Sequence, residues 1–341
     1  MSSEWVGRPT PPTQGETGRN PNQNLKILEE LVKKISSQTT GFFTLEAPLI
    51  LMSSPPSSPP TLLGFLSQSR WLLASALAMF AVGLSLDLVQ PFNSTFLERD
   101  LSLSKERLAA SIPSWLLGIL CAALPAALLL CLECASHVKQ GGRGFPQPFL
   151  LLGLGLALAS TMLATNALKN AIGSKRPNFF ALCQYSGYQE ALASRNASSA
   201  AWLAYEAATQ LGAPGSLAKC AAAAADAQRS FPSGHSSLSF AGLAFLALAL
   251  RASAGLGAGD WLSPAALAAG SPLALAMYIA ATRVRENWHR EVDVSVGALL
   301  GSTLALAAWH TVARLRGVAP PLCGDKPKPD EDSASLTQHP V

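Results

Sequence analysis

Residues 148–168 read PFLLLGLGLALASTMLATNAL, a run that contains no charged side chain. A helix that crosses a bilayer needs about 20 predominantly apolar residues, so this stretch is long enough to span. Five more predominantly apolar runs of similar length occur, near 71–92, 110–132, 236–257, 264–282 and 294–315, and Asp87 interrupts the first of them. Helices satisfy their own backbone in lipid, whereas open sheets do not. The sequence therefore predicts an all-α integral membrane protein with six transmembrane helices.

The composition supports a membrane protein. Charged residues make up only 13% of the 341 residues and hydrophobic residues 49%, whereas an average soluble protein carries about 25% charged residues. This balance excludes a disordered chain, a coiled coil and a small disulfide scaffold. The formal net charge of +4 is too small to indicate a nucleic-acid partner.

The segments outside the spans differ in composition from the apolar core. Residues 1–60 are predicted to be a disordered cytoplasmic tail, with a short amphipathic helix at 25–35 and a stiff Pro-rich linker at 53–60. That helix could lie on the membrane surface or be solvated. Residues 61–317 are predicted to form the six-span domain, with a large lumenal loop at 178–231, and residues 318–341 form a second cytoplasmic tail.

Two independent signals orient the spans. Basic residues favour the cytoplasmic side of a membrane, and they flank the face that carries both predicted termini: Lys33, Lys34, Arg70, Lys139, Arg143, Arg314 and Arg316. Arg99, Lys105 and Arg107 on the opposite face make this bias modest. The N-glycosylation sequons at Asn93 and Asn196 both fall on that opposite face. We therefore expect cytoplasmic termini and a lumenal or extracellular face that carries the sequons.

Three polar constellations cluster on the predicted outer face. They are Lys169 with Arg176-Pro177 after the third span, the stretch Phe231-Pro232-Ser233-Gly234-His235 before the fourth, and Arg283, His289 and Asp293 between the fifth and the sixth. If the three cations converge without acidic partners, they repel one another, and a phosphate relieves that repulsion. Ser233 at a predicted helix start can act as N-cap, and the free N–H groups there also bind anions.

The two histidines complete a phosphoryl-transfer site. His289 and Asp293 are four residues apart and share a face of a helix, so the carboxylate can fix the imidazole tautomer and leave the other nitrogen as a nucleophile. His235 beside the anion suits proton transfer to the leaving oxygen. The cations are side chains and no cluster of metal-ligand spacing occurs, so no metal or other cofactor is expected.

These motifs, in the pattern K-x6-RP, PSGH and R-x5-H-x3-D, resemble those of the type 2 phosphatidic acid phosphatases, also called lipid phosphate phosphatases. The resemblance covers roughly residues 71–315, and Phe180 and Cys183 after Arg-Pro look like the eukaryotic branch. It implies an active site at the outer membrane face. It also implies these roles: phosphate binding by Lys169, Arg176, Ser233, Gly234 and Arg283, a His235 acid, a His289 nucleophile and an Asp293 orienter. Thr282 stands where the family usually has Ser, and Trp288-His289-Arg290 departs from the usual His-His-Trp.

The resemblance implies hydrolysis of lipid phosphate monoesters through phosphohistidine. Candidate substrates are phosphatidate, lysophosphatidate, diacylglycerol pyrophosphate and sphingoid-base phosphates. A lipid headgroup transferase similar to sphingolipid synthases is the alternative enzyme, and a non-catalytic scaffold on the same fold is another alternative. A vanadium haloperoxidase is disfavoured by the six spans, and a transporter does not explain two histidines among three cations.

Several properties stay open from the sequence alone. The membrane could be the endoplasmic reticulum, the plasma membrane or a vacuole-type compartment, and the oligomeric state is undetermined. Cys183 and Cys220 share one polar stretch, so a disulfide between them requires that this stretch face an oxidising compartment. Lys175, beside Arg176, is expected to be solvated.

Overall fold

The computed structural model describes residues 62–139, 148–194, 198–222, 224–257, 260 and 262–315. All of them belong to the unit Ser58–Val341. The predicted tails, the amphipathic helix at 25–35, the linker at 53–60 and the sequon residue Asn196 lie outside the described residues.

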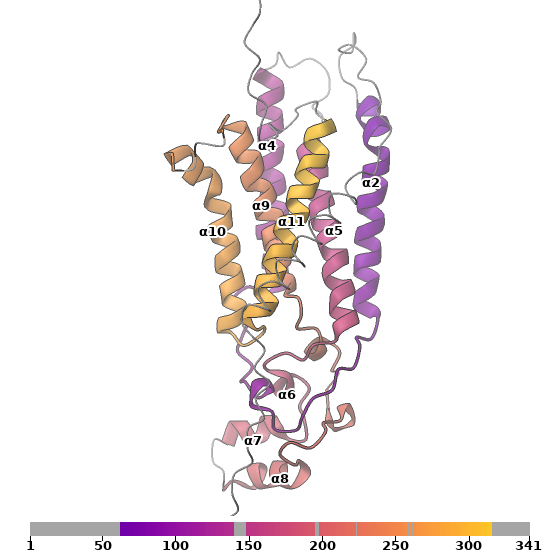
Figure 1. Ribbon diagram of the computed structural model, residues 1–341, viewed down its shortest axis with the longest axis vertical. Helices are drawn as coiled ribbons and strands as arrows, with labels where there is room; N and C mark the ends of the chain where they lie inside the picture. Colours follow the sequence, from indigo (N-terminus) through magenta and orange to yellow (C-terminus); the bar gives the residue numbers. More distant parts are fainter. Residues whose placement is uncertain are drawn as a thin grey trace, which may run out of the picture. The chain divides into compact units, whose positions relative to one another are not determined.

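Long helices dominate the described part of the chain (Figure 1). They are α2 (Leu62–Ser85), α4 (Leu124–Lys139), α5 (Phe149–Ile172), α9 (Gly234–Ser253), α10 (Pro264–Arg285) and α11 (Glu291–Leu315). The helix α4 continues α3 (Ser114–Gly118) through one π-helical turn, η3 (Ile119–Ala123). Six helical segments of the described residues are long and apolar enough to cross a membrane, as predicted.

Prolines shift two of the predicted boundaries. The sequence predicts a first span that reaches residue 92, but α2 ends at Ser85 and is followed only by a 3-10 turn, η1 (Leu86–Leu88). It predicts a second span from residue 110, but α3 begins after Pro113, which occupies the N-cap. A proline disfavours helical backbone in the residue before it, so Gln90 and Ile112 stay outside the helices.

The third span is longer than predicted, and this has a consequence for Lys169. The helix α5 continues to Ile172 and ends at Gly173, which has φ +59° and whose N–H donates to Lys169 O at 3.0 Å. A Cβ at Gly173 would lie 1.6 Å from Phe92 O. Only glycine combines this left-handed conformation with such a close approach. Lys169 is thereby placed in the last helical turn rather than in a loop.

The helix α9 is the centre of the bundle and packs against α5, α10 and α11, while α2 packs against α5. Two glycines on α11 allow its backbone to approach α9 closely. A Cβ at Gly301 would lie 2.0 Å from Ser237 O, and one at Gly297 would lie 2.7 Å from Ser233 O. The backbone of α11 therefore lies directly against the first turns of α9, where the second motif begins.

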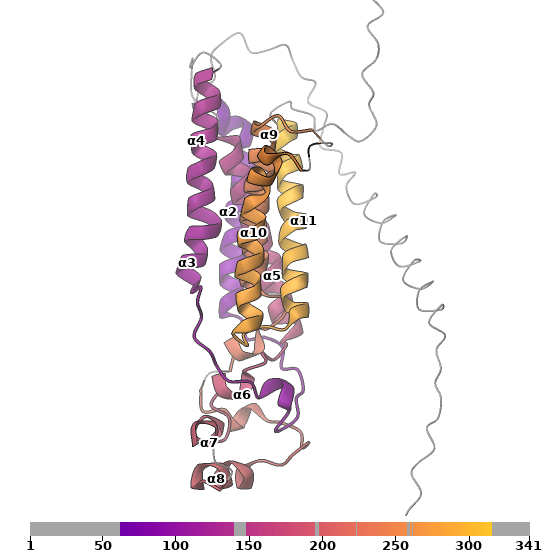
Figure 2. The ribbon, with the colours of Figure 1, turned by 90° about the vertical axis from the view of Figure 1, so that its left-hand side faces the viewer.

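The large loop folds at one end of the bundle, as Figures 1 and 2 show. It contains α6 (Phe179–Leu182), α7 (Tyr188–Ser194), α8 (Ala200–Ala208) and the 3-10 turns η4 (Leu217–Lys219) and η5 (Asp226–Gln228). Together with residues 93–104, which include η2 (Leu101–Leu103), the described residues of 178–230 form what we call the end cap. Its core is a cluster of buried aromatic rings: Phe96, Phe179, Phe180, Tyr185, Tyr188 and Tyr205.

Polar links tie the end cap together. Glu98 is 2% exposed and accepts hydrogen bonds from Tyr185 Oη, Gln210 N and Lys219 Nζ, each at 2.7 Å. The structure joins Cys183 and Cys220 in a disulfide, with the Cα atoms 5.1 Å apart. The large loop is thus a folded unit rather than a simple connection.

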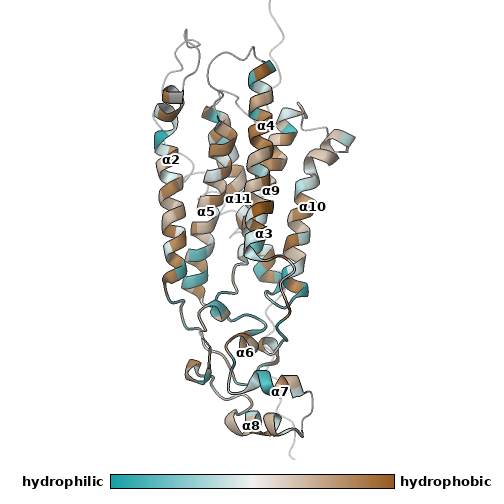
Figure 3. Ribbon diagram, turned by 180° about the vertical axis from the view of Figure 1, so that it is seen from behind, coloured by the Kyte–Doolittle hydropathy of each residue, from teal (hydrophilic) through white to brown (hydrophobic). Residues whose placement is uncertain are grey.

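Hydrophobic residues predominate along the long helices, as the hydropathy colouring of Figure 3 shows. On α2 alone Leu63, Trp71 and Leu77 are 79%, 74% and 70% exposed. Contiguous apolar surface of this kind promotes aggregation in water, whereas lipid solvates it. The surface therefore agrees with an integral, multi-pass membrane protein.

Candidate active site

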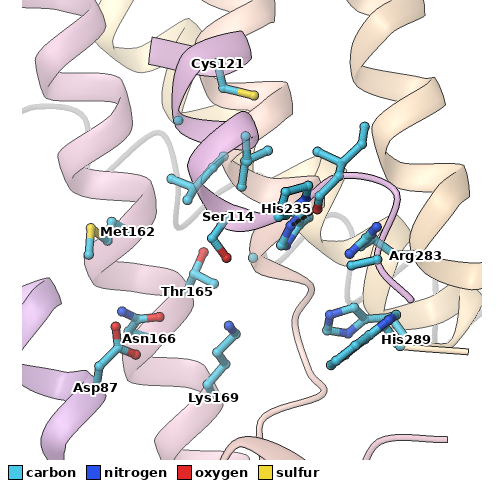
Figure 4. Close-up of a pocket in the computed structure, with 18 of the residues that line it drawn as sticks. Asp87, Ser114, Cys121, Met162, Thr165, Asn166, Lys169, His235, Arg283 and His289 are labelled. Carbon is cyan, nitrogen blue, oxygen red and sulfur yellow. Dashed lines mark hydrogen bonds between the residues drawn. The ribbon is translucent and has the colours of Figure 1, made fainter. Parts of the chain in front are cut away.

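The antiparallel course of the spans brings the three motifs to one end of the bundle. Lys169 lies in the last turn of α5, His235 in the first turn of α9 and Arg283 in the last turn of α10. His289 lies in the short connection before α11, and Asp293 in the first turn of α11. Figure 4 shows Lys169, His235, Arg283 and His289 around a common space.

That space is a cavity of about 620 Å³ at the junction of the bundle and the end cap. Six of the predicted residues line it: Lys169, Arg176, Gly234, His235, Arg283 and His289. Ser233 and Asp293 do not line it. Ser233 has no exposed surface and acts as the predicted N-cap, with its hydroxyl accepting from Ser236 N at 3.4 Å. Its hydroxyl is therefore engaged at the helix N-terminus in this structure, and phosphate binding by Ser233 stays a prediction.

His289 is held as a neutral imidazole with one defined tautomer. Its Nδ1 lies 2.7 Å from Ser230 O. A carbonyl oxygen only accepts, so Nδ1 carries the proton and the lone pair is on Nε2. Nε2 lies 3.3 Å from Arg176 Nη1 at the cavity. Burial, reinforced by Arg176 and Lys169 and opposed by Asp293, lowers the pKa of His289 to about 3, so the neutral form prevails at neutral pH.

Asp293 acts on His289 less directly than the spacing predicts. Its Oδ2 lies 3.7 Å from His289 Nδ1, which is longer than a hydrogen bond. The same oxygen accepts from Ser230 Oγ at 2.5 Å and from Arg290 N at 3.0 Å. Asp293 therefore holds Ser230, and the Ser230 carbonyl holds the ring. The sequence offers no signal for Ser230, because a backbone carbonyl can come from any residue type.

Two of the three cations have carboxylate partners, contrary to the premise that they converge without acidic residues. Arg176 donates from Nη2 to Asp226 Oδ1 at 2.7 Å and from Nε to Asp226 O at 2.8 Å. Arg283 Nη2 lies 2.5 Å from Glu286 Oε2. Glu286 could have been found, because it follows Arg283 by three residues on a helix. Asp226 is separated from Arg176 by fifty positions, and no local pattern connects them.

These pairs keep both carboxylates ionised. Burial would raise the pKa of Asp226, but the charges of Arg176 and Lys169 hold it below its ordinary value. Burial likewise opposes the ionisation of Glu286, but the hydrogen bonds from Ser111 and the charge of Arg283 lower its pKa.

Lys169 differs from the two arginines. No hydrogen bond or ion pair among the described residues involves its Nζ. Gly234 leaves room for it, since a Cβ at that position would lie 3.1 Å from Nζ. The arrangement places an ammonium group beside the N-terminus of α9, whose N–H groups also favour an anion.

His235 contacts the segment before α3. Its Nε2 lies 3.0 Å from Ile112 O, so Nε2 carries a proton. Ile112, Pro113 and Ser114 also line the cavity. A ligand oxygen that bound in the cavity at the same distance from Nε2, in place of Ile112 O, would accept a hydrogen bond from His235. Within the described residues there is no group of three or more His, Cys, Asp or Glu side chains placed to bind a metal ion.

Lys175 is not solvated, contrary to the expectation from sequence. It is 5% exposed, and its Nζ donates to Gln228 Oε1 at 2.8 Å, Ser94 O at 2.9 Å and Asn93 Oδ1 at 3.2 Å. Burial lowers its pKa to about 8. Lys175 thus connects the first motif to both parts of the end cap. The side chain of Asn93 itself is exposed.

The cavity has a second, apolar limb that the motifs do not predict. Side chains from α2, α3, η3, α5 and α9 line it: Phe80, Leu117, Cys121, Leu158, Met162 and Leu238. Figure 4 shows Cys121 and Met162 on the side of the cavity away from Lys169 and His289. One cavity therefore joins a cationic end to an apolar one.

Comparison with known proteins identifies the family of the chain. A family model described as the PAP2 superfamily matches residues 150–316. A probable diacylglycerol pyrophosphate phosphatase 1 of Schizosaccharomyces pombe is 31% identical over 245 residues, which cover 70% of this chain and 78% of that protein. Lipid phosphate phosphatase 1 of Arabidopsis thaliana is 27% identical over 68% of this chain and 64% of its own length.

A third relative, the diacylglycerol pyrophosphate phosphatase 1 of Saccharomyces cerevisiae, is 33% identical over 55% of this chain and 58% of its own length. No solved structure matches the chain. The fungal and plant relatives, the matched family model and the six apolar helices agree with one another. The chain therefore belongs to the PAP2 superfamily, in its eukaryotic lipid phosphate phosphatase branch.

Proposed function

We propose that this protein hydrolyses lipid phosphate monoesters through a phosphohistidine intermediate on His289, without a metal ion. The observation that carries the proposal is the single cavity in which the cations and both histidines share a space with an apolar limb. A phosphate head group fits the first part, and a lipid tail fits the second. The names of the relatives, lipid phosphate and diacylglycerol pyrophosphate phosphatases, support the same class of reaction.

In the first step, the lone pair of His289 Nε2 attacks phosphorus, and the bond from phosphorus to the lipid oxygen breaks. The leaving alkoxide takes a proton from His235 Nε2, which gives the free lipid alcohol. Lys169, Arg176 and Arg283 stabilise the charge on the phosphoryl oxygens. The imidazolium that forms on His289 is stabilised by the Ser230 carbonyl and by Asp293, 3.7 Å from Nδ1.

In the second step, water attacks the phosphohistidine and its proton passes to His235. The bond from phosphorus to Nε2 breaks, which returns the lone pair to His289 and releases inorganic phosphate. Both steps use only side chains that already line the cavity or support it. His235 changes from acid to base between the steps, as expected for a two-step displacement.

The apolar limb supports a lipid rather than a soluble phosphate ester. Removal of an acyl chain from water contributes roughly 0.8 kcal/mol per CH₂ group, so a chain-bearing phosphate is concentrated at the membrane where the cavity lies, whereas a small sugar phosphate is not. Phosphatidate, lysophosphatidate, diacylglycerol pyrophosphate and sphingoid-base phosphates all carry such a chain.

We also propose that the end cap faces the lumen or the outside and that both tails, residues 1–60 and 318–341, are cytoplasmic. The disulfide between Cys183 and Cys220 supports an oxidising compartment on this side. The exposed side chain of Asn93 leaves its sequon open to glycosylation, and the second sequon at Asn196 falls in the same loop region.

The test is release of inorganic phosphate from phosphatidate in detergent micelles with excess EDTA. We expect activity in the wild type, none in His289→Ala and full activity in His310→Ala, a histidine near the opposite end of α11. Activity that survives His289→Ala would exclude His289 as the nucleophile. A folded wild type that releases no phosphate but moves a head group between two lipids would instead support a transferase.

A further inference from the structure

The segment 105–113, which we call the strap, joins the end cap to α3 and lies along the connection between α10 and α11. Two side chains of that connection and the last residue of α10 hold its backbone or hydroxyl groups. Trp288 Nε1 donates to Leu108 O at 3.1 Å, Asn287 Nδ2 to Glu106 O at 3.2 Å, and Arg285 Nη2 to Ser111 Oγ at 3.2 Å. The strap is therefore fixed to the third motif along most of its length.

Glu286 lies beneath these contacts and is 4% exposed. Its two carboxylate oxygens have different partners. Oε2 receives Arg283 Nη2 at 2.5 Å, and Oε1 receives the backbone N–H of Ser111 at 3.1 Å, with Arg285 Nη2 at 3.6 Å. Glu286 does not line the cavity. One buried carboxylate thus joins a cation of the site to the strap.

Two of the links from Glu286 lead to the cavity, one directly through Arg283 and one through Ser111 to the neighbouring Ile112. Arg283 has its Nε donating to Thr282 Oγ1 at 3.2 Å and its Nη2 held by Glu286, so its guanidinium has one defined orientation. On the other side, Ser111 precedes Ile112, whose carbonyl oxygen lies 3.0 Å from His235 Nε2. Arg283 and the strap segment that contacts His235 are therefore both held by the same carboxylate.

We infer that Glu286 is a positioning residue that aligns Arg283 with the strap, and through Ile112 with His235. This inference rests on the proposed function. Glu286 touches no substrate in this scheme. It fixes Arg283 relative to the strap segment that contacts His235 before the proton is transferred, and fixed geometry of this kind lowers the reorganisation that the reaction requires.

The isosteric variant Glu286→Gln tests the inference without creating a cavity. A carboxylate offers two acceptor oxygens, whereas an amide offers one oxygen and one NH₂ donor. The NH₂ group must then face either Arg283 or the Ser111 N–H, so one link breaks. We expect kcat/KM for phosphatidate to fall about ten- to hundred-fold, the range of a lost hydrogen bond to a charged group. The inhibition constant for inorganic phosphate should rise about tenfold or more.

Glu98→Gln is the matched control, because Glu98 is equally buried and also accepts from a backbone N–H and a cation. It lies in the core of the end cap and does not line the cavity. Loss of its charge should lower thermal stability and leave the inhibition constant for phosphate unchanged. Glu286→Asp, which keeps the charge but is one methylene shorter, should give an intermediate inhibition constant.

Two results would overturn the inference. The first is that Glu286→Gln keeps both its inhibition constant for phosphate and its kcat/KM within about twofold of the wild type. If Glu286→Gln does not fold, an unchanged inhibition constant in Glu286→Asp overturns the inference instead. The other is an equal rise of the inhibition constant in Glu98→Gln. If the wild type releases no phosphate from any lipid, the proposed function fails instead. Binding of inorganic phosphate, measured by calorimetry on the same variants, then decides the role of Glu286.

Discussion

Replacing Asp293 by asparagine removes a charge and little else. Both donors to Asp293, Ser230 Oγ and Arg290 N, bind the same oxygen, Oδ2. An asparagine oxygen in that place can accept both hydrogen bonds, so the local structure should persist. The variant therefore isolates the electrostatic interaction between the carboxylate and the His289 imidazolium that the proposed mechanism forms when phosphorus binds Nε2.

The size of that interaction follows from the geometry. For a charge separation of 3.7 Å and an effective dielectric constant of about 20, Coulomb's law gives roughly 4 kcal/mol. About 1.4 kcal/mol corresponds to a factor of ten in rate, so kcat should fall about a thousandfold in Asp293→Asn. KM should change little, because the imidazole is neutral when the substrate binds.

Steady-state phosphate release from phosphatidate micelles measures both constants. Ser230→Ala is the companion variant, because it removes the hydroxyl that donates to Asp293 but keeps the charge and the Ser230 carbonyl. We expect a loss of about tenfold there, the value of one charge-assisted hydrogen bond. A kcat in Asp293→Asn within tenfold of the wild type, or a larger loss in Ser230→Ala, would refute the electrostatic role of Asp293.

Two further predictions follow from the cavity and from His289. Gly118 lines the apolar limb, and a Cβ at this position would meet no other atom within 4 Å. Gly118→Leu should therefore fill the limb and raise KM for long-chain phosphatidate but not for a short-chain analogue. Gly155→Leu, which is equally open but outside the cavity, is the control, and equal effects of both variants would contradict a tail-binding limb. Because the pKa of His289 in the folded protein is about 3 and about 6.5 in an unfolded chain, the unfolded state takes up the proton first. Stability should therefore be fully present above pH 6.5 and fall as the pH drops towards 3. Melting temperatures between pH 4 and pH 7 should show a shallower slope for His289→Gln than for the wild type, and identical slopes would contradict a buried neutral His289.

The parts of the site that depend on local spacing could be predicted from the sequence. The N-cap role of Ser233 follows from a hydroxyl at a helix start, and the arrangement of Lys169, His235 and Arg283 follows from helices that alternate in direction across a bilayer. Each of these inferences uses only residues close in sequence or the up-and-down order of the spans.

The parts that depend on tertiary packing could not be predicted. Asp226 reaches Arg176 only because the end cap folds back on the first motif. The Ser230 carbonyl holds His289 through a backbone group, which leaves no trace in residue type. Lys175 resembles a surface residue in the sequence because a lysine beside an arginine carries no sign of the aromatic and amide groups that bury it.

The charged groups of the site occupy the terminal turns of α5, α9, α10 and α11 or the connections between them. This placement matters for how the protein enters a membrane. A lysine or arginine at the centre of a span costs about 2.5–3.5 kcal/mol on insertion scales, whereas one near the end reaches the interface at a much lower cost. The site therefore adds no charge to the middle of a span, and it is assembled only when the helix ends meet.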